Sequence, residues 1–492
     1  MQKRSSGILM HISSLPGRYG IGDFGREAYR FIDFLVESGQ GSWQILPLGV
    51  TGYGDSPYQN FSAFAGNPYF IDLDEFLTKG YLTEKDIEKE DLGSDPLSVD
   101  YGKLHEGKNR LLRKAYGNSA GILKADLEGF LADHGKWLRD YALFMSIKTV
   151  NGGKSWFGWG EELRDYSSKK VAEFEKENPE EIYFHVFLQY FFFRQWKALK
   201  AYANNHGVRI IGDIPIYVAE DSSDLWANPK FFNLDRKLNP KTVAGCPPDA
   251  FSATGQLWGN PIYDWDAMEK DGYSFWIDRI KASLDLYDSV RIDHFRGFEA
   301  YWEIKYGSLD AVKGEWTKGP GMKLFMKIKE ELGEMDIIAE DLGFLTEEVF
   351  QLIRDTGFPG MKVLQFAFDS RESNDYLPHT YDKNCVVYTG THDNETTQEW
   401  MDSVNREDFS QAVRYLKLNY DEGLVWGFIR GAWSSVANLA IAPMQDFLCL
   451  GREARMNKPS TIGGNWTWRV NKDEMNSCLA KRIRELTKRY GR

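Results

Sequence analysis

Apolar residues near the start of the chain recur at helical spacing between two short apolar runs. The helical series consists of Phe24, Ala28, Phe31, Ile32, Leu35 and Val36. The run Ile8–Ile12 precedes this series, and Trp43–Leu46 follows it and ends at Pro47. A strand, a helix and a second strand in this order are typical of a parallel α/β protein.

The same alternation returns after residue 180 and continues toward the end of the chain. A helix is predicted over His185–Asn205, and a strand over Val208–Gly212 follows it. Five more strands are predicted at Ser289–Ile292, Ile337–Ala339, Val363–Phe368, Cys385–Thr389 and Leu439–Ala442. Eight strands separated by helical segments predict an α/β fold, a (β/α)8 TIM barrel, with a doubly wound sheet as the alternative.

Two segments interrupt this alternation and are too long for ordinary connections between a strand and a helix. Residues 54–180 begin with an aromatic, loop-rich stretch and continue as charged, mainly helical sequence, and residues 219–265 are rich in Trp, Pro and Gly. We therefore expect a single catalytic domain over 1–492 with two insertions over the C-terminal face of the barrel. The first, 54–180, would be a mainly helical subdomain, and the second, 219–265, an aromatic, Gly-rich substrate-binding subdomain.

Charge and aromatic content narrow the class of ligand. The 492 residues include 60 Lys and Arg against 72 Asp and Glu, which gives a formal net charge of −12. Neither nucleic acid nor a membrane surface is expected as a partner, because both are anionic. Aromatic residues make up 15% of the chain, with 16 Trp, 25 Tyr and 31 Phe, and this surplus suits a ligand with flat apolar faces such as a sugar ring.

Cysteine spacing and segment hydropathy predict a cytoplasmic protein. The four cysteines, Cys246, Cys385, Cys449 and Cys478, are far apart and lack metal-type spacing, as expected of reduced thiols. The N-terminal apolar stretch is too short for a signal peptide, and no apolar run approaches the roughly 18 residues of a membrane span. We find no P-loop, EF-hand or HExxH motif in the sequence, so no metal or other cofactor is expected.

Four of the predicted strands end in, or shortly before, a carboxylate: Asp213, Asp293, the pair Glu340 and Asp341, and Asp393. The C-terminal ends of barrel strands converge on one pocket, so we expect these side chains to meet there. A Mg²⁺ or Ca²⁺ site could gather such a cluster. Without a metal motif, the cluster better suits cleavage of a glycosidic bond, which needs one ionised carboxylate as nucleophile and one protonated carboxyl as acid.

Neighbouring residues suggest how the carboxylates divide these roles. The fixed charge of Arg291, two residues before Asp293, would keep that carboxyl ionised as a nucleophile requires; a structural pair with another acid is the alternative. Partial burial after Ile337–Ala339 would raise the pKa of Glu340 and keep it protonated, as a general acid requires. Asp341 competes for that role, but adjacent strand residues face opposite ways, so only one of the two can point at the substrate.

Two histidines adjoin candidate carboxylates, since His294 follows Asp293 and His392 precedes Asp393. Neutral imidazole is a common metal ligand, which is one interpretation of this placement. Hydrogen bonding to a sugar hydroxyl or to the neighbouring carboxylate is the favoured one.

Three segments at these strand ends resemble the signature segments of the 4-α-glucanotransferases, glycoside hydrolase family 77, which are also called amylomaltases or disproportionating enzymes. They are Val290-Arg-Ile-Asp-His-Phe-Arg-Gly-Phe298, Ala339-Glu-Asp-Leu-Gly343 and Thr389-Gly-Thr-His-Asp-Asn-Glu-Thr396. The resemblance covers nearly the whole chain and includes Ser14-Leu-Pro-Gly17, Ser56-Pro-Tyr58, Gly212-Asp-Ile-Pro-Ile-Tyr-Val218, Pro247-Pro-Asp-Ala-Phe251, Gly255-Gln-Leu-Trp-Gly-Asn-Pro261 and Gly464-Asn-Trp-Thr-Trp-Arg469. One departure is Ser460, where we expect Gly after Pro459.

The resemblance implies a retaining transferase on a (β/α)8 barrel, with Asp293 as nucleophile, Glu340 as acid/base and Asp393 as transition-state stabiliser. It also implies a set of substrate-binding residues: Arg291, His294 and His392 around the cleaved sugar, and Asp213, Tyr58, Trp258 and Asn260 on donor-side or acceptor-side segments. Tyr101 is similar to an aromatic residue that the family uses for a second glucan contact away from the centre, with plain packing as the alternative. The implied partners are maltooligosaccharides, starch-type or glycogen-type α-1,4-glucans, and glucose as acceptor.

Two other functions fit parts of this pattern. An α-1,4-glucan hydrolase would use the same carboxylates with water as the acceptor. A non-catalytic glucan-binding protein would use the aromatic residues and would not need the acids. Redistribution of chain lengths in maltotriose separates the transferase from the hydrolase, and loss of turnover with retained binding on changing Asp293 separates an enzyme from a binding protein.

Overall fold

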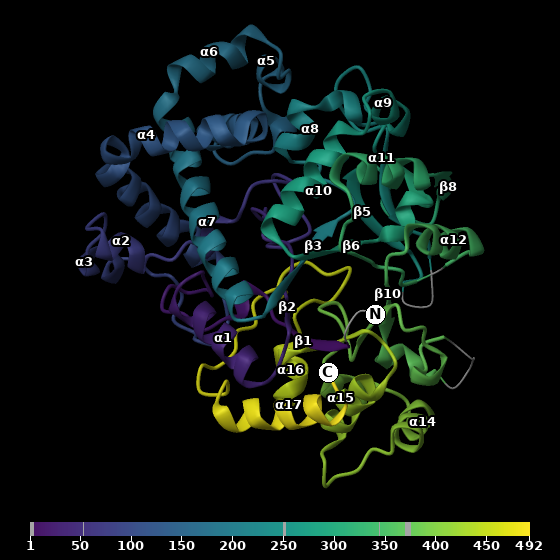
Figure 1. Cartoon of the computed structure of the whole chain (residues 1–492). Coiled ribbons are helices and arrows are strands. Elements are labelled where there is room, and N and C mark those ends of the chain that lie inside the picture. The colour runs from purple at the N-terminus through teal and green to yellow at the C-terminus, as the bar shows by residue number, and fades with distance from the viewer. Residues whose placement is uncertain (1–3, 53, 249–251, 344, 370–374) are drawn as a thin grey trace.

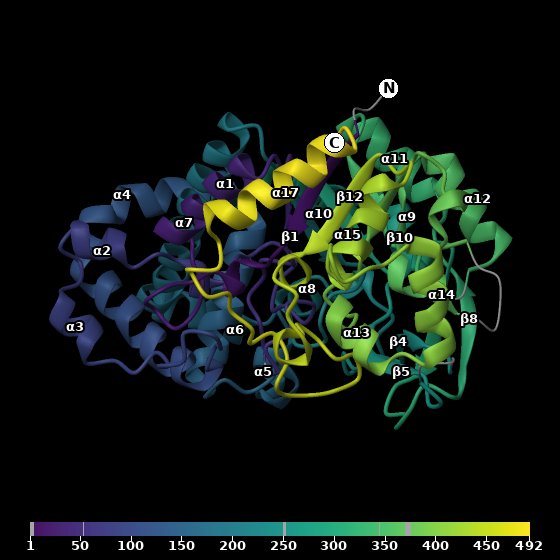
Figure 2. The same ribbon diagram turned by 90° about the horizontal axis from the view of Figure 1, so that it is seen from below.

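The computed structural model describes residues 4–52, 54–248, 252–343, 345–369 and 375–492. Positions 249–251 of the segment Pro247–Phe251 lie outside the described residues. Both described ends of the chain lie close together in Figures 1 and 2. They are joined by a hydrogen bond of 2.8 Å from Arg4 Nη1 to the Tyr490 carbonyl oxygen.

Eight parallel strands form a nearly closed barrel. In chain order they are β1 Ser5–Leu9, β2 Ser42–Gln44, β3 Arg209–Pro215, β6 Ser289–Asp293, β9 Ile337–Ala339, β10 Gly360–Val363, β11 Cys385–Tyr388 and β12 Leu439–Pro443. Each pairs with the next except β9 with β10, and β12 pairs with β1. The gap between β9 and β10 is bridged where the Ala339 amide donates to the Pro359 carbonyl oxygen over 2.9 Å. The (β/α)8 prediction is therefore confirmed, and the doubly wound alternative, which needs two open sheet edges, is wrong.

Two of the predicted strands are displaced from their positions. The strand predicted at Val363–Phe368 ends at Val363, and Leu364–Phe368 forms a 3₁₀ helix. Likewise, β1 ends at Leu9 and the apolar run predicted as strand continues into a 3₁₀ turn over Ile12–Ser14. The cause is the same in both places: the apolar residues stay buried beyond the strand end, so burial alone does not mark where pairing stops.

Helices surround the barrel on the outside (Figure 1). They are α1 Arg26–Glu37, α7 Pro179–Asn205, α10 Ser274–Leu286, α11 Met322–Leu332, α12 Glu347–Thr356, α13 Thr397–Ser403, α14 Arg406–Leu416, α15 Leu424–Ser434, α16 Met444–Phe447 and α17 Ser477–Arg489. The predicted first helix is present, although Val36 of the apolar series is 40% exposed. Helix α7 begins six residues before the predicted start, because Pro179 at its first position fixes a helical φ without needing a hydrogen-bond donor.

A second group of helices lies to one side of the barrel in Figures 1 and 2. These helices are α2 Asp74–Thr78, α3 Glu84–Glu88, α4 Tyr101–Val150, α5 Glu161–Arg164 and α6 Lys169–Glu177. Helix α4 is kinked at Gly135, whose φ of 57° suits glycine, and it packs against α7.

A small antiparallel sheet has the strand order β5–β4–β7–β8. Its strands are β4 Thr242–Cys246, β5 Gln256–Pro261, β7 Ala300–Lys305 and β8 Gly314–Lys318, and the short helices α8 Ser223–Ala227 and α9 Trp265–Lys270 lie in the same part of the chain. The sequence analysis missed this sheet, since two of its strands follow β6 and lie outside the predicted insertion 219–265. The division into one catalytic domain with insertions at 54–180 and 219–265 stays a prediction.

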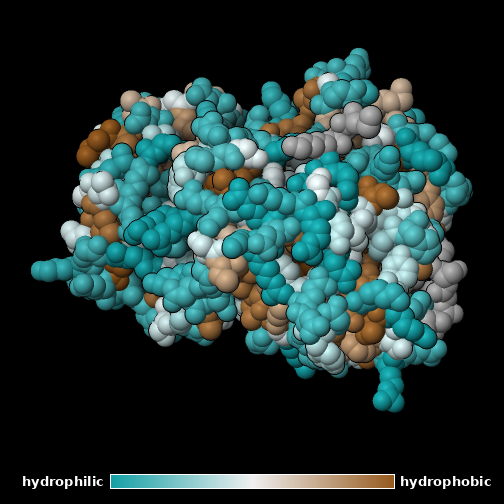
Figure 3. Space-filling model, turned by 60° about the horizontal axis from the view of Figure 1, so that its bottom comes forward, coloured by the Kyte–Doolittle hydropathy of each residue, from teal (hydrophilic) through white to brown (hydrophobic). Residues whose placement is uncertain are grey.

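The surface shown in Figure 3 is mainly hydrophilic, with apolar residues in small scattered patches. Among the described residues, none of the helices combines the length and the apolar character needed to cross a membrane.

Candidate active site

A buried arginine joins two carboxylates at the ends of neighbouring strands. The pairing of β3 with β6 places Asp213 opposite Arg291, which makes both side chains emerge on one face. Arg291 Nη1 donates to Asp213 Oδ2 over 2.6 Å, and Nη2 donates to Asp293 Oδ1 over 2.9 Å. The Asp293 side chain stays 31% exposed while Arg291 and Asp213 are buried, so Asp293 is the member of the trio that a ligand can reach.

Glu340 follows β9 and lies against the same group. Its two carboxylate oxygens accept hydrogen bonds from the backbone amides of His294 and Leu342, at 2.6 and 2.7 Å. Burial, and then the negative charge of Asp293, raise the pKa of Glu340 to about 7, against the opposing effect of Arg291. The carboxyl can therefore carry a proton near neutral pH, as a general acid requires.

Asp341 points away from this group, as alternation along a strand predicts. Its Oδ1 accepts from the Met361 amide over 2.6 Å. The carboxylate also fills the space beside Gly360 of β10, where a Cβ atom would lie 2.4 Å from Oδ2. Asp341 is therefore a structural link between β9 and β10, and Glu340 is the residue of the pair that lies near Asp293.

The loop after β11 supplies the last carboxylate. Asp393 Oδ1 accepts from Asn457 Nδ2 over 2.6 Å, and Oδ2 lies 3.3 Å from His392 Nε2. Burial alone would raise the pKa of Asp393, but His392 and Asn457 outweigh it and hold this pKa well below its ordinary value. In return, the Asp393 charge raises the pKa of the buried His392, which burial alone would lower.

Aromatic rings lie beside these carboxylates. The Tyr58 hydroxyl donates to Asp213 Oδ2 over 2.8 Å, and its ring stacks on His392 with centroids 5.2 Å apart and an interplanar angle of 15°. Trp466 lies 6.0 Å from both of these rings. Tyr58 thereby connects the Asp213–Arg291 pair to the loop that carries Asp393.

Strand β5 of the small sheet reaches the site through Trp258 and Asn260. The ring of Trp258 meets His294 edge to face at 4.7 Å. Burial lowers the pKa of His294 to about 3, so its ring is neutral, and its Nε2 has no hydrogen-bond partner among the described residues. Asn260 is buried, donates to the Val218 carbonyl oxygen over 2.8 Å and accepts from Gln59.

Tyr101 lies apart from this cluster, at the first residue of α4. Its hydroxyl donates to the Trp466 carbonyl oxygen over 2.9 Å, and its ring is half-buried. This contact supplies a packing role, and the second glucan contact expected for Tyr101 stays a prediction.

Sequence reasoning missed three residues that hold the loop after β11. Asp446 accepts from the hydroxyl groups of Thr389 and Thr397 at the two ends of the loop, over 2.5 and 2.7 Å. Asn457 binds Asp393 directly, and Arg455 Nη2 donates to the Asp393 carbonyl oxygen over 3.2 Å. The sequence analysis singles out only Ser460 in this segment, because nothing in the spacing links Asn457 to Asp393.

The cluster is organised as a set of ion pairs and hydrogen bonds rather than as a metal centre. Within the described ranges, no group of three or more His, Cys, Asp or Glu side chains is arranged to hold a metal ion. The expectation that the protein uses no metal or other cofactor stays a prediction.

Comparisons with known proteins agree with this architecture. A family model described as 4-alpha-glucanotransferase matches residues 10–475. A 4-alpha-glucanotransferase from Clostridium butyricum is 55% identical over 98% of this chain and 100% of that protein, and one from Thermus thermophilus is 49% identical over 98% of each. The solved structure of the amylomaltase from Streptococcus agalactiae in complex with acarbose matches all of both chains, with a TM-score of 0.97 and 43% identity. The chain therefore belongs to the 4-α-glucanotransferase family.

Proposed function

We propose that the protein transfers a segment of an α-1,4-glucan to the 4-hydroxyl of an acceptor glucan or of glucose, by a retaining double displacement. The observation that carries this proposal is the contrast between two neighbouring carboxyl groups. Asp293 is paired with the cation Arg291, whereas Glu340 is buried with its pKa raised to about 7. One ionised and one protonated carboxyl at the same site is what a retaining glycosidic reaction needs.

In the first step, Asp293 attacks the anomeric carbon of the donor glucan. The bond from that carbon to the bridging oxygen breaks, and Glu340 gives its proton to the departing oxygen. The products are a covalent glucosyl ester on Asp293 and a shortened glucan with a free 4-hydroxyl. Asp393 would hold sugar hydroxyls while the ring flattens and positive charge develops.

In the second step, Glu340 acts as a base. It takes the proton of the acceptor 4-hydroxyl, whose oxygen attacks the anomeric carbon and releases the Asp293 carboxylate. Two inversions leave the α configuration unchanged. The residues of the chain supply both steps, so the proposal needs no cofactor.

The proposed substrate contacts fall into two groups. Arg291, His294 and His392 would bind the cleaved sugar, and Asp213 would bind on the donor or acceptor side. Support comes from Asp213 Oδ1 and His294 Nε2, which are buried without a hydrogen-bond partner among the described residues and would gain one from sugar hydroxyls. Tyr58, Trp258, Asn260 and the more remote Tyr101 would bind further units of the chain, the aromatic rings by packing on sugar faces.

The proposed substrates are maltooligosaccharides and starch-type or glycogen-type glucans. Support for an α-glucan comes from the family and from the acarbose complex of the Streptococcus agalactiae amylomaltase. We also propose that glucose serves as an acceptor, that the protein is cytoplasmic, and that it has no nucleic-acid or membrane partner.

Incubation with maltotriose tests the reaction class. A transferase redistributes the sugar into longer and shorter chains with few new reducing ends, because an acceptor bound beside the intermediate outcompetes water at effective molarities on the order of 10⁵ M. One new reducing end for each cleavage would instead identify a hydrolase. Tyr58→Ala and Trp258→Ala are expected to raise hydrolysis relative to transfer, because both changes remove a surface that positions the acceptor and shields the site.

The assignment of Asp293 has a separate test. Asp293→Asn keeps the hydrogen-bonding shape and removes the nucleophile, so turnover should fall by about 10⁴-fold or more. A slow, activated α-glucosyl substrate should label the peptide that contains Asp293 in the parent protein. A label on Asp341 or Asp393 would contradict the assignment.

The role of Glu340 is tested by the leaving group. Glu340→Gln should keep formation of the intermediate from substrates with very good leaving groups and should block ordinary maltooligosaccharides, because only a sugar leaving group needs the proton. Equal loss with both kinds of substrate would show that Glu340 is not the acid.

A further inference from the structure

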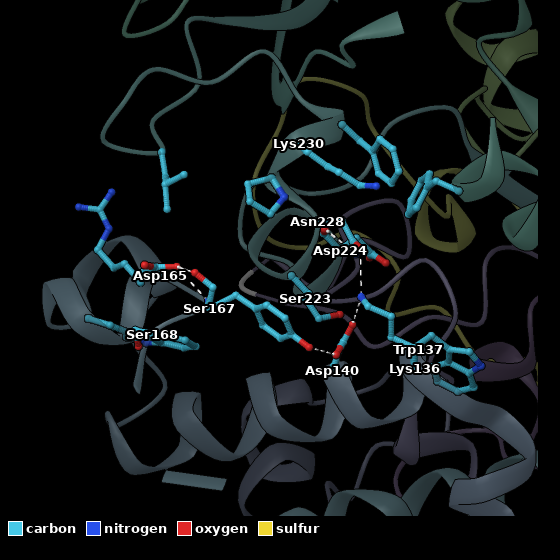
Figure 4. Close-up of a pocket in the computed structure, with 18 of the residues that line it drawn as sticks. Lys136, Trp137, Asp140, Asp165, Ser167, Ser168, Ser223, Asp224, Asn228 and Lys230 are labelled. Atoms are coloured by element: carbon cyan, nitrogen blue, oxygen red, sulfur yellow. Dashed lines mark hydrogen bonds and ion pairs between the residues drawn. The ribbon is translucent and has the colours of Figure 1, made fainter. Parts of the chain in front are cut away.

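A large groove lies away from the carboxylate cluster. It has a volume of about 1290 Å³ and is bounded by the C-terminal half of α4, the segment 159–168, the region around α8 and the start of α10 (Figure 4). None of the proposed catalytic or substrate-binding residues lines it. The groove exceeds the usual volume of a pocket for one small ligand, so its size suits an oligomer.

One wall of the groove carries aromatic rings. Phe64 and Trp137 stack with their centroids 5.9 Å apart at an interplanar angle of 20°, and both are only half-buried. The buried Phe275, which also borders the groove, meets Phe64 edge to face at 6.0 Å. An apolar, accessible platform of this kind matches the flat face of a sugar ring.

The floor of the groove carries a chain of polar contacts, drawn in Figure 4. The Tyr166 hydroxyl donates to Asp140 Oδ1 over 2.6 Å, Lys136 Nζ donates to Asp140 Oδ2 over 2.5 Å, and Lys136 also donates to Asn228 Oδ1 over 3.1 Å. The Asp140 side chain is only 5% exposed, so the group of this chain of contacts that a ligand can reach is Lys136, whose side chain is 62% exposed.

The charge of the lining selects the class of ligand. Six acidic and five basic side chains border the groove, so their charges nearly cancel. A phosphate, a nucleotide or an acidic peptide would favour an excess of cations, as strong anion sites have. A balanced, polar lining beside aromatic rings fits a neutral polyhydroxylated chain.

We propose that this groove is an additional binding site for α-1,4-glucan, separate from the carboxylate cluster and from the contact expected at Tyr101, and that it holds a polymer while a neighbouring segment of that polymer occupies the carboxylate cluster. The inference rests on the proposed function for the choice of glucan. The segment between the sites is short: Phe64 is six residues from Tyr58, so their Cα atoms are at most about 22 Å apart. When a polymer is bound in the groove, its neighbouring segment is present at the active site at an effective concentration in the millimolar range. This increases the binding of polymers that span both sites and does not affect the binding of a trisaccharide.

The same segment is fixed to the groove by α8. The Ser223 amide donates to the Phe61 carbonyl oxygen over 2.8 Å, and the Ala63 amide donates to Asp224 Oδ2 over 2.7 Å. Both Ser223 and Asp224 border the groove, whereas Phe61 and Ala63 lie in the segment between the two sites. The groove is therefore held at a fixed place relative to Tyr58.

The test compares a polymer with a short substrate. Trp137→Ala removes half of the aromatic platform, and Lys136→Met removes the central polar contact at a position whose side chain is 62% exposed. Tyr190→Ala is the matched control, because Tyr190 packs against Phe130 in the same pair of helices α4 and α7 but does not border the groove.

Binding is measured as retardation in native gels that contain glycogen, in an Asp293→Asn background that prevents turnover. Activity is measured as kcat/KM on glycogen and on maltotriose in the otherwise unchanged protein.

We expect Trp137→Ala to weaken glycogen binding and kcat/KM on glycogen by about 5- to 10-fold, and Lys136→Met by about 3-fold, with kcat/KM on maltotriose within about 2-fold of the parent. The control should match the parent in every measurement. Unchanged glycogen binding in both groove variants would overturn the proposal, as would an equal loss on glycogen and maltotriose. Failure of the proposed function would look different: maltotriose would not be redistributed by the parent, while the gel assay would still report on the groove.

Discussion

Replacing Glu340 by Gln should change how the stability of the protein depends on pH. The pKa of Glu340 is about 7 in the folded protein, against an ordinary value of 4.5. Between these two values the folded state holds a proton that the unfolded chain has lost, so this group makes stability fall as the pH rises from 4.5 to about 7. At about 1.4 kcal/mol per pH unit, ionisation of this carboxyl lowers the free energy of unfolding by about 3 kcal/mol above pH 7. Below the ordinary pKa this loss is absent.

The glutamine side chain has a similar shape but does not ionise. Its single acceptor oxygen can serve only one of the two amides, His294 and Leu342, that donate to the carboxylate, at a cost of about 1 kcal/mol at every pH. Glu340→Gln is therefore expected to be about 1 kcal/mol less stable than the parent near pH 4 and about 2 kcal/mol more stable near pH 8. For a chain of 492 residues, 1 kcal/mol corresponds to about 1 °C in Tm, so the difference in Tm should change sign and span about 3 °C.

Differential scanning calorimetry at fixed ionic strength and scan rate measures this difference. Glu315→Gln is the control, because Glu315 lies exposed on β8 and its replacement should shift Tm equally at both pH values. Parallel pH profiles for the parent and Glu340→Gln would refute the argument that burial and the charge of Asp293 raise the pKa of Glu340. The same argument predicts that kcat/KM of the parent falls on the alkaline side of about pH 7, as the acid loses its proton.

Three further changes test the supports of the site. Asn457→Ala should lower kcat by about 10- to 100-fold with little change in KM or Tm, because Asp393 loses the amide that fixes its carboxylate; an equal rise in KM would instead indicate lost ground-state binding. Arg455→Lys should lower kcat by a smaller factor, since a single ammonium cannot replace the forked contacts of the guanidinium around Asp393. Gly360→Ala should reduce stability by about 1–3 kcal/mol, seen as a lower Tm, because the new methyl group overlaps the buried carboxylate of Asp341.

The barrel could be predicted because its strands are buried on both faces. Runs such as Ile337–Ala339 and Leu439–Ala442 are almost continuously apolar, and apolar residues in the flanking segments recur at the spacing of a helix. The predicted barrel then indicated that the carboxylates at the strand ends lie close together, because parallel barrel strands present their C-terminal ends to one pocket. Strand alternation also indicated that only one of Glu340 and Asp341 can point at the substrate.

The boundaries were less predictable than the elements. Leu364–Phe368 is apolar and buried like a strand, but it coils into a 3₁₀ helix beyond the end of β10. The true strand, Gly360–Val363, contains Gly and Lys and was hidden by the stronger apolar run that follows it. Burial determines whether a residue is apolar, whereas hydrogen bonding to a neighbouring strand determines whether it belongs to a β-strand. This pairing depends on distant residues and cannot be predicted from one short window of sequence.

The small antiparallel sheet escaped prediction for a related reason. Strands β7 and β8 are partly exposed, and the whole of Gly314–Lys318 except Thr317 is exposed, so their apolar pattern is weak. Strand β8 pairs with β7, and the other partner of β7, β4, lies more than 50 residues earlier in the chain. Only a long-range contact identifies them as one sheet, which then presents Trp258 to His294.

The loop after β11 shows why the residues that hold a site are harder to find than those that act in it. Thr389 and Thr397 at its two ends donate to the same buried carboxylate, Asp446, and Asn457 closes on Asp393 between them. The fixing groups come from segments about 50 to 65 residues further along the chain, where they follow no local period. A carboxylate that stabilises developing charge gains most when it is already oriented in the empty site, because no reorganisation is then needed during the reaction. Loosening this loop should therefore appear in kcat rather than in binding, and the residues that determine the rate extend beyond those that contact the sugar.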